Sequence, residues 1–144
     1  MIETTVLQPG HMLCVRLQGV QSVAEFGALG NTLSQTASRR RWCLLLDWTA
    51  LEGWDDRRSF PVSCQGWHAT AKLIARLSIV HRHRWNHQAA LLAAVLRVHG
   101  VQVRSWPERE RAQAASWLSY LQDEATYDLD ARSVSEGRSP KRWR

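Results

Sequence analysis

Residues 74–121 constrain the fold more than any other part of the chain. This run, IARLSIVHRHRWNHQAALLAAVLRVHGVQVRSWPERERAQAASWLSYL, indicates a strand, a loop, a helix ending at Gly100, a second strand, and a helix that begins near Pro107. Two strands that are each followed by a helix within about 45 residues require crossover connections, which are typical of α/β folds. The run therefore predicts a layered α/β domain.

The N-terminal segment indicates a hairpin. Residues 4–8 and 12–18 alternate in polarity as half-buried strands do, and Pro9-Gly10 between them is typical of a tight turn. Gly19 is expected to end the second strand. Ser22 and Glu25 then have the spacing of a capping box, which predicts the start of a helix.

Residues 42–48 (WCLLLDW) form a nearly continuous apolar run, which is typical of a central strand covered on both faces. The polar segment that follows contains Gly53, so a loop is expected over 48–54. Asp55 and Asp56 are interpreted as caps of the next helix. The core-facing stripe of that helix is predicted to be Phe60, Cys64, Trp67, Ala71 and Ile74.

Together these segments predict an α/β fold with five strands and four helices. The expected order is β-β-α-β-α-β-α-β-α. Residues 1–125 form the domain, and residues 126–144 form a basic C-terminal tail that composition predicts to be disordered.

Composition excludes several classes of protein. The chain has 144 residues and lacks both a signal peptide and a run of about 20 apolar residues, so a cytoplasmic protein is expected. Cys14, Cys43 and Cys64 have no zinc-site spacing and are expected to be buried reduced thiols. The net charge is +6, but residues 131–144 alone carry five basic side chains and one acidic one. The remaining domain is expected to be close to neutral.

Four motifs, in order, resemble the SpoIIAA-like family, which is related to STAS domains. LLLDWTALEGW contains Asp47 and the Gly53-Trp54 pair, and IARLSIVHRHRW follows it about 20 residues later. VQVRSWP and AASWL then correspond to the last strand and the closing helix of that family. The resemblance covers residues 3–121 and implies a mixed five-stranded sheet with the four helices on its two faces.

The resemblance implies a binding or regulatory module without established catalysis. Its partner would be another protein or a small apolar or lipid-like ligand, and a homodimer is compatible with it. STAS antagonists are switched by phosphorylation of a serine after the central strand, where this chain has Thr49 and no serine. A phosphorylation switch at Thr49 is therefore not favoured.

Open α/β sheets bind ligands at the carboxyl ends of their strands. Segments 48–54 and 81–86 are expected to form the lip of such a site. The candidate binding residues are Asp47, Trp48, Thr49, Trp54, His81, His83 and Trp85.

Three alternatives remain open. Asp47, His81 and His83 have the side chains for an acid/base or metal-dependent hydrolase. With His87, the two histidines also have a spacing that a zinc site uses. The basic tail is suited to nucleic acid. No catalytic motif is present, no catalytic or metal-binding residue is assigned, no cofactor is expected, and nucleic acid is not the favoured partner.

Overall fold

The computed structural model describes residues 1–8, 12–36 and 41–119. Its five strands lie side by side in the order of the sequence, and β1 is antiparallel to β2 while the other neighbours are parallel. The predicted mixed five-stranded sheet is confirmed. The strands are β1 (Ile2–Gln8), β2 (Met12–Gln21), β3 (Trp42–Trp54), β4 (Ile74–His81) and β5 (Gln102–Pro107).

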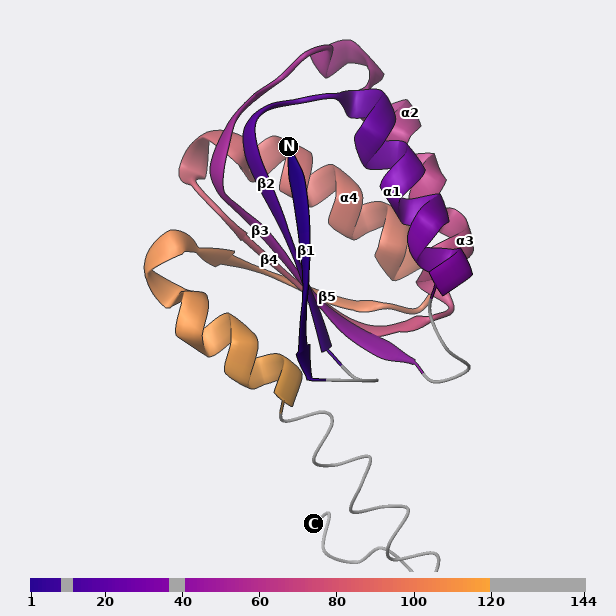
Figure 1. Ribbon diagram of the computed structural model, residues 1–144, viewed down its shortest axis with the longest axis vertical. Coiled ribbons are helices and arrows are strands. Elements are labelled where there is room, and N and C mark those ends of the chain that lie inside the picture. The colour runs from indigo at the N-terminus through magenta and orange to yellow at the C-terminus, as the bar shows by residue number, and fades with distance from the viewer. Residues whose placement is uncertain (9–11, 37–40, 120–144) are drawn as a thin grey trace, which may run out of the picture.

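The helices lie on both faces of the sheet, but unequally (Figure 1). All helices between strands cover one face, because crossovers of one hand between sequential parallel strands return on the same side. A last helix over residues 111–119 covers the other face. The predicted order of elements is confirmed if the short α2 and α3 are taken as one broken helix. The crossover helices are α1 (Val23–Thr36), α2 (Phe60–Cys64), α3 (His68–Ala71) and α4 (Asn86–Val98).

The central strand is β3, as the apolar run predicted, and it is buried on both faces from Cys43 to Trp48. The prediction of a loop over 48–54 is wrong, because the strand continues to Trp54. Pairing with β4 stops at Asp47, but pairing with β2 continues to Trp54. Cross-strand hydrogen bonds to β2 keep this polar segment extended.

Two register shifts make the long β2–β3 pairing irregular. Gly19 lies at one of them, inside β2 rather than at its end, with a φ of +69°. Only glycine adopts this left-handed conformation without strain, and it is typical of a β-bulge. The expectation that Gly19 ends the strand is therefore wrong.

Side chains from two segments cap α1. The Glu25 amide donates to Ser22 Oγ (3.1 Å), which confirms the predicted cap. The Val23 amide donates to Asp55 Oδ1 (2.9 Å), so Asp55 caps α1 rather than the helix that follows it. Asp56 instead accepts the Ser59 hydroxyl. Sequence spacing cannot reveal a cap that comes from 32 residues away.

The apolar stripe predicted between β3 and β4 is buried as expected, but the segment does not form one regular helix. All five residues are buried, but Ile74 is the first residue of β4 instead of part of a helix. The rest of the segment is divided into short turns: η1 (Arg57–Ser59), α2, η2 (Gln65–Trp67) and α3. Gly66 explains one break. A Cβ on it would lie 2.3 Å from the Gly27 carbonyl oxygen, so the backbones of α1 and η2 are in direct contact.

The core has two parts, one on each face. The larger part, on the face covered by α1–α4, contains a cluster of interlocking rings: Phe26, Trp48, Trp54, Phe60, Trp67 and Trp85. The smaller part lies under the 111–119 helix: Met12, Cys14, Cys43, Leu45, Val80, Trp106, Ala114 and Leu118. Cys14, Cys43 and Cys64 are buried free thiols, as expected.

Several expectations fall outside the described residues. The Pro9-Gly10 turn, the end of the last helix beyond residue 119 and the 126–144 tail all lie there. Within the described part of the chain, no helix has the length and apolar character needed to cross a membrane.

Candidate functional site

A hollow of about 270 Å³ lies at the carboxyl ends of β4 and β5. β4 ends at His81, which pairs with Pro107 at the end of β5. The turn η3 (His83–Trp85) then leads into α4 and closes one side. We call this the β4–β5 hollow, and it is lined by His81, His83, Asn86, Ser105, Trp106, Pro107 and Arg109.

Hydrogen bonds fix both histidine rings of the hollow. His81 Nδ1 lies 2.8 Å from the Arg82 carbonyl oxygen, which can only accept, so this nitrogen carries the proton. Asn86 Nδ2 lies 2.8 Å from His83 Nδ1 and donates to it. The neutral His83 ring therefore carries its proton on Nε2. His81 is buried, whereas His83 is exposed. The His81 ring is thus part of the wall of the hollow, and the His83 ring is accessible from solvent.

The rim of the hollow is rich in arginine. Arg82 Nε lies 3.5 Å from Glu108 Oε2, and both side chains are about half exposed. Arg84 donates to the Glu52 carbonyl oxygen (3.1 Å), and its guanidinium lies 4.5 Å from the centre of the Trp85 ring. Such stacking holds an arginine in place while its charge remains exposed.

Arg82 and Arg84 belong to a longer segment without acidic residues, which ends just before Glu108. From residue 57 to residue 107 the chain has eight lysines and arginines, five histidines and no aspartate or glutamate. Because the strands lie in sequence order, this segment forms one lateral half of the sheet, with β4, β5 and α4. The net charge of the whole domain does not reveal this uneven distribution of acidic and basic residues. Charge counted segment by segment would have revealed it.

Three of the candidate site residues belong to the core instead of to the lip. Trp48, Trp54 and Trp85 are all buried among the aromatic rings under α1 and α2. Trp85 Nε1 also donates to the Leu51 carbonyl oxygen (3.2 Å), which ties η3 to β3. None of these three side chains lines the β4–β5 hollow.

Asp47 and Thr49 lie on the opposite face of the sheet, beneath the 111–119 helix. The amide and hydroxyl of Thr49 both donate to Asp47 Oδ1, at 3.0 and 2.7 Å. Arg111 Nη1 lies 2.7 Å from Asp47 Oδ2, an ion pair whose angles are poor for a hydrogen bond. Asp47 is fully buried and Arg111 is about half exposed. The pair fastens the helix to the sheet.

Asp47 is not brought to the other two candidate hydrolase residues, His81 and His83, which both line the β4–β5 hollow. Asp47 pairs with Val80, so both side chains lie on the face under the 111–119 helix. Alternation along β4 directs His81 to the other face. The described residues also contain no group of three or more His, Cys, Asp or Glu side chains that could hold a metal ion.

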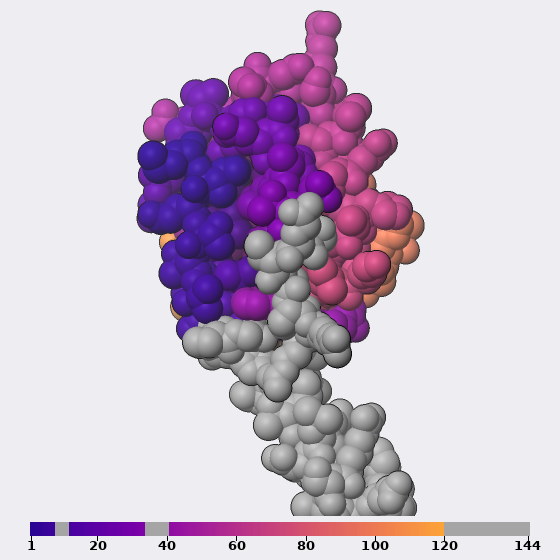
Figure 2. All heavy atoms as spheres, turned by 45° about the vertical axis from the view of Figure 1, so that its right-hand side comes forward, coloured from indigo at the N-terminus to yellow at the C-terminus, as the bar shows by residue number. Residues whose placement is uncertain are grey.

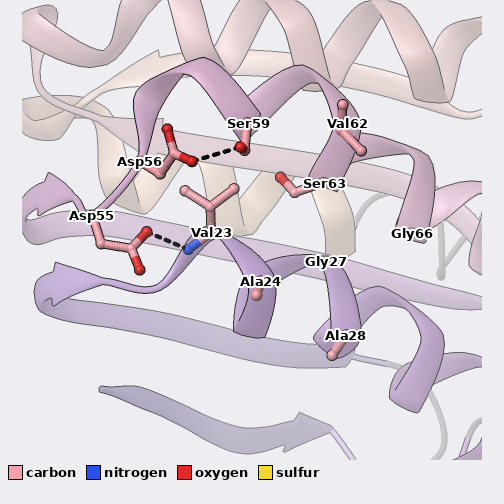
Figure 3. Close-up of a pocket in the computed structure, with 10 residues that line it drawn as sticks. All are labelled: Val23, Ala24, Gly27, Ala28, Asp55, Asp56, Ser59, Val62, Ser63 and Gly66. Carbon is pink, nitrogen blue, oxygen red and sulfur yellow. Dashed lines mark hydrogen bonds between the residues drawn. The ribbon is translucent and has the colours of Figure 1, made fainter.

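A second hollow, of about 400 Å³, lies between α1 and the segment 55–66 (Figure 3). Asp55 and Asp56 lie at one end of this hollow. One carboxylate oxygen of Asp55 already accepts the Val23 amide, and one of Asp56 accepts the Ser59 hydroxyl. Small side chains line the rest, where the α1 and η2 backbones approach closely. We interpret this hollow as a packing seam.

A third hollow, of about 550 Å³, follows the outer edge of β5 and extends to Trp117. Here the guanidinium of Arg104 lies 4.5 Å from the Trp106 ring centre, and that of Arg76 lies 4.5 Å from the Trp117 ring centre. This open surface continues the positive charge of the β4–β5 half.

Comparison with known proteins adds no assignment. No known family model matches this chain, and no curated protein matches it.

Proposed function

We propose that this protein is a non-enzymatic binding module of SpoIIAA-like type that recognises an acidic segment of a protein partner at the β4–β5 hollow. The observation that carries the proposal is the hollow itself, because it combines polar side chains with a position at the end of the acid-free segment 57–107, where the adjacent Glu108 is paired with Arg82. The resemblance of the motifs to the SpoIIAA-like family supports a regulatory rather than a catalytic role.

The chemistry of the hollow favours an anionic group. Arg109 and Asn86 are hydrogen-bond donors, and the neutral His83 ring presents Nε2–H. Charge-assisted hydrogen bonds from arginine to carboxylate are among the strongest in proteins. The surrounding arginines also increase the rate at which an acidic partner is captured. Carboxylates of an acidic segment are therefore the groups that fit best.

An apolar or lipid-like ligand is less well supported. The tryptophans that were expected to line a pocket are packed against one another in the core. A hollow with an almost wholly apolar lining, between Leu33 and Ile74, has a volume of only about 20 Å³. That is room for about one water molecule.

The hydrolase alternative would need Asp47 beside His81, and these side chains lie on opposite faces of the sheet. Nucleic-acid binding through the tail concerns residues beyond those that the structure describes. Neither alternative has a specific observation in its favour.

An NMR titration with an oligoglutamate peptide tests the proposal. We expect amide shifts to concentrate at His81, His83, Asn86 and Arg109, and to weaken as salt is added. Arg109→Gln is expected to reduce affinity about five- to tenfold, as loss of a charged interface contact does.

Lys72→Gln is the matched control, because it removes one exposed charge at the amino end of β4, the opposite end of the sheet. Its affinity is expected to stay within about twofold of the unmodified chain, since surface charges far from a site are screened. An equal loss in both variants would mean that the peptide binds by general charge, and the proposal would fail. It would also fail if an oligolysine peptide shifted the same amides.

A further inference from the structure

The two edges of the sheet are protected to different degrees. At the β5 edge, Arg97 Nη2 donates to the Val103 carbonyl oxygen (2.7 Å), and the strand contains Arg104 and ends in Pro107. Charged side chains and proline are the usual means by which an edge strand avoids pairing with another chain. The β5 edge is therefore blocked.

The β1 edge has almost none of these protections. Its seven residues include one charge, Glu3, and no proline or lysine. The strand is almost entirely exposed, and Figure 2 shows this N-terminal segment on the surface. Val6 is 52% and Leu7 is 45% exposed. Among the described residues, β1 pairs only with β2. An unprotected edge of this kind is a template for another strand.

The hydrogen-bond pattern determines which groups β1 offers at this edge. Met1 and Gln18 exchange both of their backbone hydrogen bonds, at 2.9 Å each. In an antiparallel pair such residues alternate with residues whose N–H and C=O point away from the partner strand. The outward-pointing residues of β1 are therefore Ile2, Thr4 and Val6.

We propose that β1 pairs with the β1 strand of a second copy of this chain, antiparallel and about a twofold axis at Thr4. Ile2 of one copy then lies opposite Val6 of the other, and Thr4 lies opposite Thr4. Each of these pairs exchanges two N–H···O bonds. The three outward-pointing residues are all satisfied, and the two sheets join into one.

Charge selects this register over the one centred on Glu3. A shift that centres the axis on Glu3 would place two Glu3 carboxylates directly opposite each other, which is destabilising. With the axis at Thr4, Glu3 faces Thr5 of the second copy and remains beside Arg16 in β2. The β-branched side chains Ile2, Thr4 and Val6 then lie opposite one another, a favourable cross-strand combination.

The pairing extends the larger core. Ile2, Thr4 and Val6 lie opposite Leu17, Val15 and Leu13 in β2, on the face that α1–α4 cover. In the dimer, the exposed Val6 packs beside the partly buried Ile2 of the second copy. The interface lies at the opposite edge of the sheet from the β4–β5 hollow, so this proposal does not depend on the proposed function.

The size of the contact determines its strength. A seven-residue strand is about 23 Å long at ~3.3 Å per residue, and one strand pair covers less than the ~800 Å² per partner that is typical of stable complexes. We therefore expect a reversible dimer with a dissociation constant in the micromolar range or higher.

Sedimentation velocity of the full chain over a concentration series tests the dimer. Val6→Lys is expected to raise its dissociation constant about tenfold or more, because each dimer carries the lysine twice beside an apolar partner. Val98→Lys is the control, since Val98 is an 80% exposed valine on α4. A chain that is monomeric at every concentration overturns the proposal, and so does a Val6→Lys variant that dimerises like the control.

Oxidative cross-linking tests the register. Thr4→Cys places two thiols in a pair with Cα atoms about 5.5 Å apart, within the range that a disulfide spans. We expect it to form covalent dimers much faster than Glu3→Cys. The native cysteines of both variants are buried. Cross-linking that is equal or faster at position 3 overturns the proposed register.

Discussion

The two faces of the sheet are held by different forces. On the face covered by α1–α4, six aromatic rings and many aliphatic side chains pack into one continuous apolar cluster. On the other face, the apolar cluster is smaller, and polar contacts help to fasten the 111–119 helix, including a weak hydrogen bond from Cys43 Sγ to the Leu118 carbonyl and three stronger contacts. The three stronger contacts are Ser78 Oγ to the Ala114 carbonyl (3.0 Å), Arg76 Nη1 to the Trp117 carbonyl (2.9 Å) and the Asp47–Arg111 ion pair.

The difference teaches that one sheet can be stabilised by burial on one side and by specific contacts on the other. Burial is proportional to area and tolerates small changes of shape. A buried polar contact tolerates few such changes. A polar group that loses its partner but stays buried still carries its full desolvation cost. The following variants compare the two faces.

The largest effect is expected for Trp48→Ala on the aromatic face. Trp48 is fully buried against Phe26 and Trp54, so its removal is expected to lower the free energy of unfolding by about 3–5 kcal/mol. Trp117→Ala, on the second face, removes a partly exposed ring and should cost clearly less. Urea denaturation measures both values. Equal losses would show that the two faces contribute alike.

A smaller effect is expected for Arg111→Met on the second face. The variant keeps the length of the side chain but leaves the Asp47 carboxylate buried without its cation. We expect a loss of about 2 kcal/mol, below the ~3–5 of a fully buried pair because Arg111 is half exposed.

Arg109→Met is the matched control for Arg111→Met. It changes an exposed arginine two residues away and is expected to alter stability by less than about 0.5 kcal/mol. If the two variants unfold at the same urea concentration, the ion pair does not hold the helix.

The smallest effect on stability is expected from ionisation of the three cysteine thiols. The reactivity of each thiol reports how strongly it is buried. Burial raises the pKa of Cys64 on the aromatic face to about 12, and it also raises the pKa of Cys14 and Cys43 on the other face. The thiolate is the reactive form. At pH 8 we expect iodoacetamide to label Cys64 most slowly in the folded protein, and all three cysteines at similar rates in urea. Mass spectrometry measures the rates.

The same shift gives a pH dependence with a defined sign. A thiol whose pKa is raised on folding stabilises the protein fully below its unfolded pKa of 9.0. That contribution is lost as the pH rises through about 12, because only the unfolded chain ionises readily in this range. A folded protein that gained stability between pH 9 and 11 would contradict this linkage.

Much of the fold was predictable from local patterns. The apolar run 42–48 identified the central strand, the Ser22–Glu25 spacing identified the start of α1, and Gly100 marks the end of α4 with a φ of +89°. Each of these signals depends on residues close together in the chain. Burial of the stripe from Phe60 to Ile74 was also predictable, although Gly66 breaks its helix.

The candidate site was predictable only in part. His81 and His83 line a hollow at the expected end of the sheet, but Asp47 and Thr49 lie on the opposite face. The segment 48–54, expected to form a loop, is held as a strand by its pairing with β2. No local pattern encodes these outcomes, because they depend on which strand pairs beside which.

The sequence by itself determined the order of strands and helices, the doubly buried central strand and the acid-free segment 57–107, since periodicity and charge are local properties of the chain. Tertiary structure alone decided that all the crossover helices share one face, that Asp55 caps α1, and that Asp47 is paired with Arg111. These contacts join residues far apart in sequence, and only strand pairing and crossover handedness bring them together.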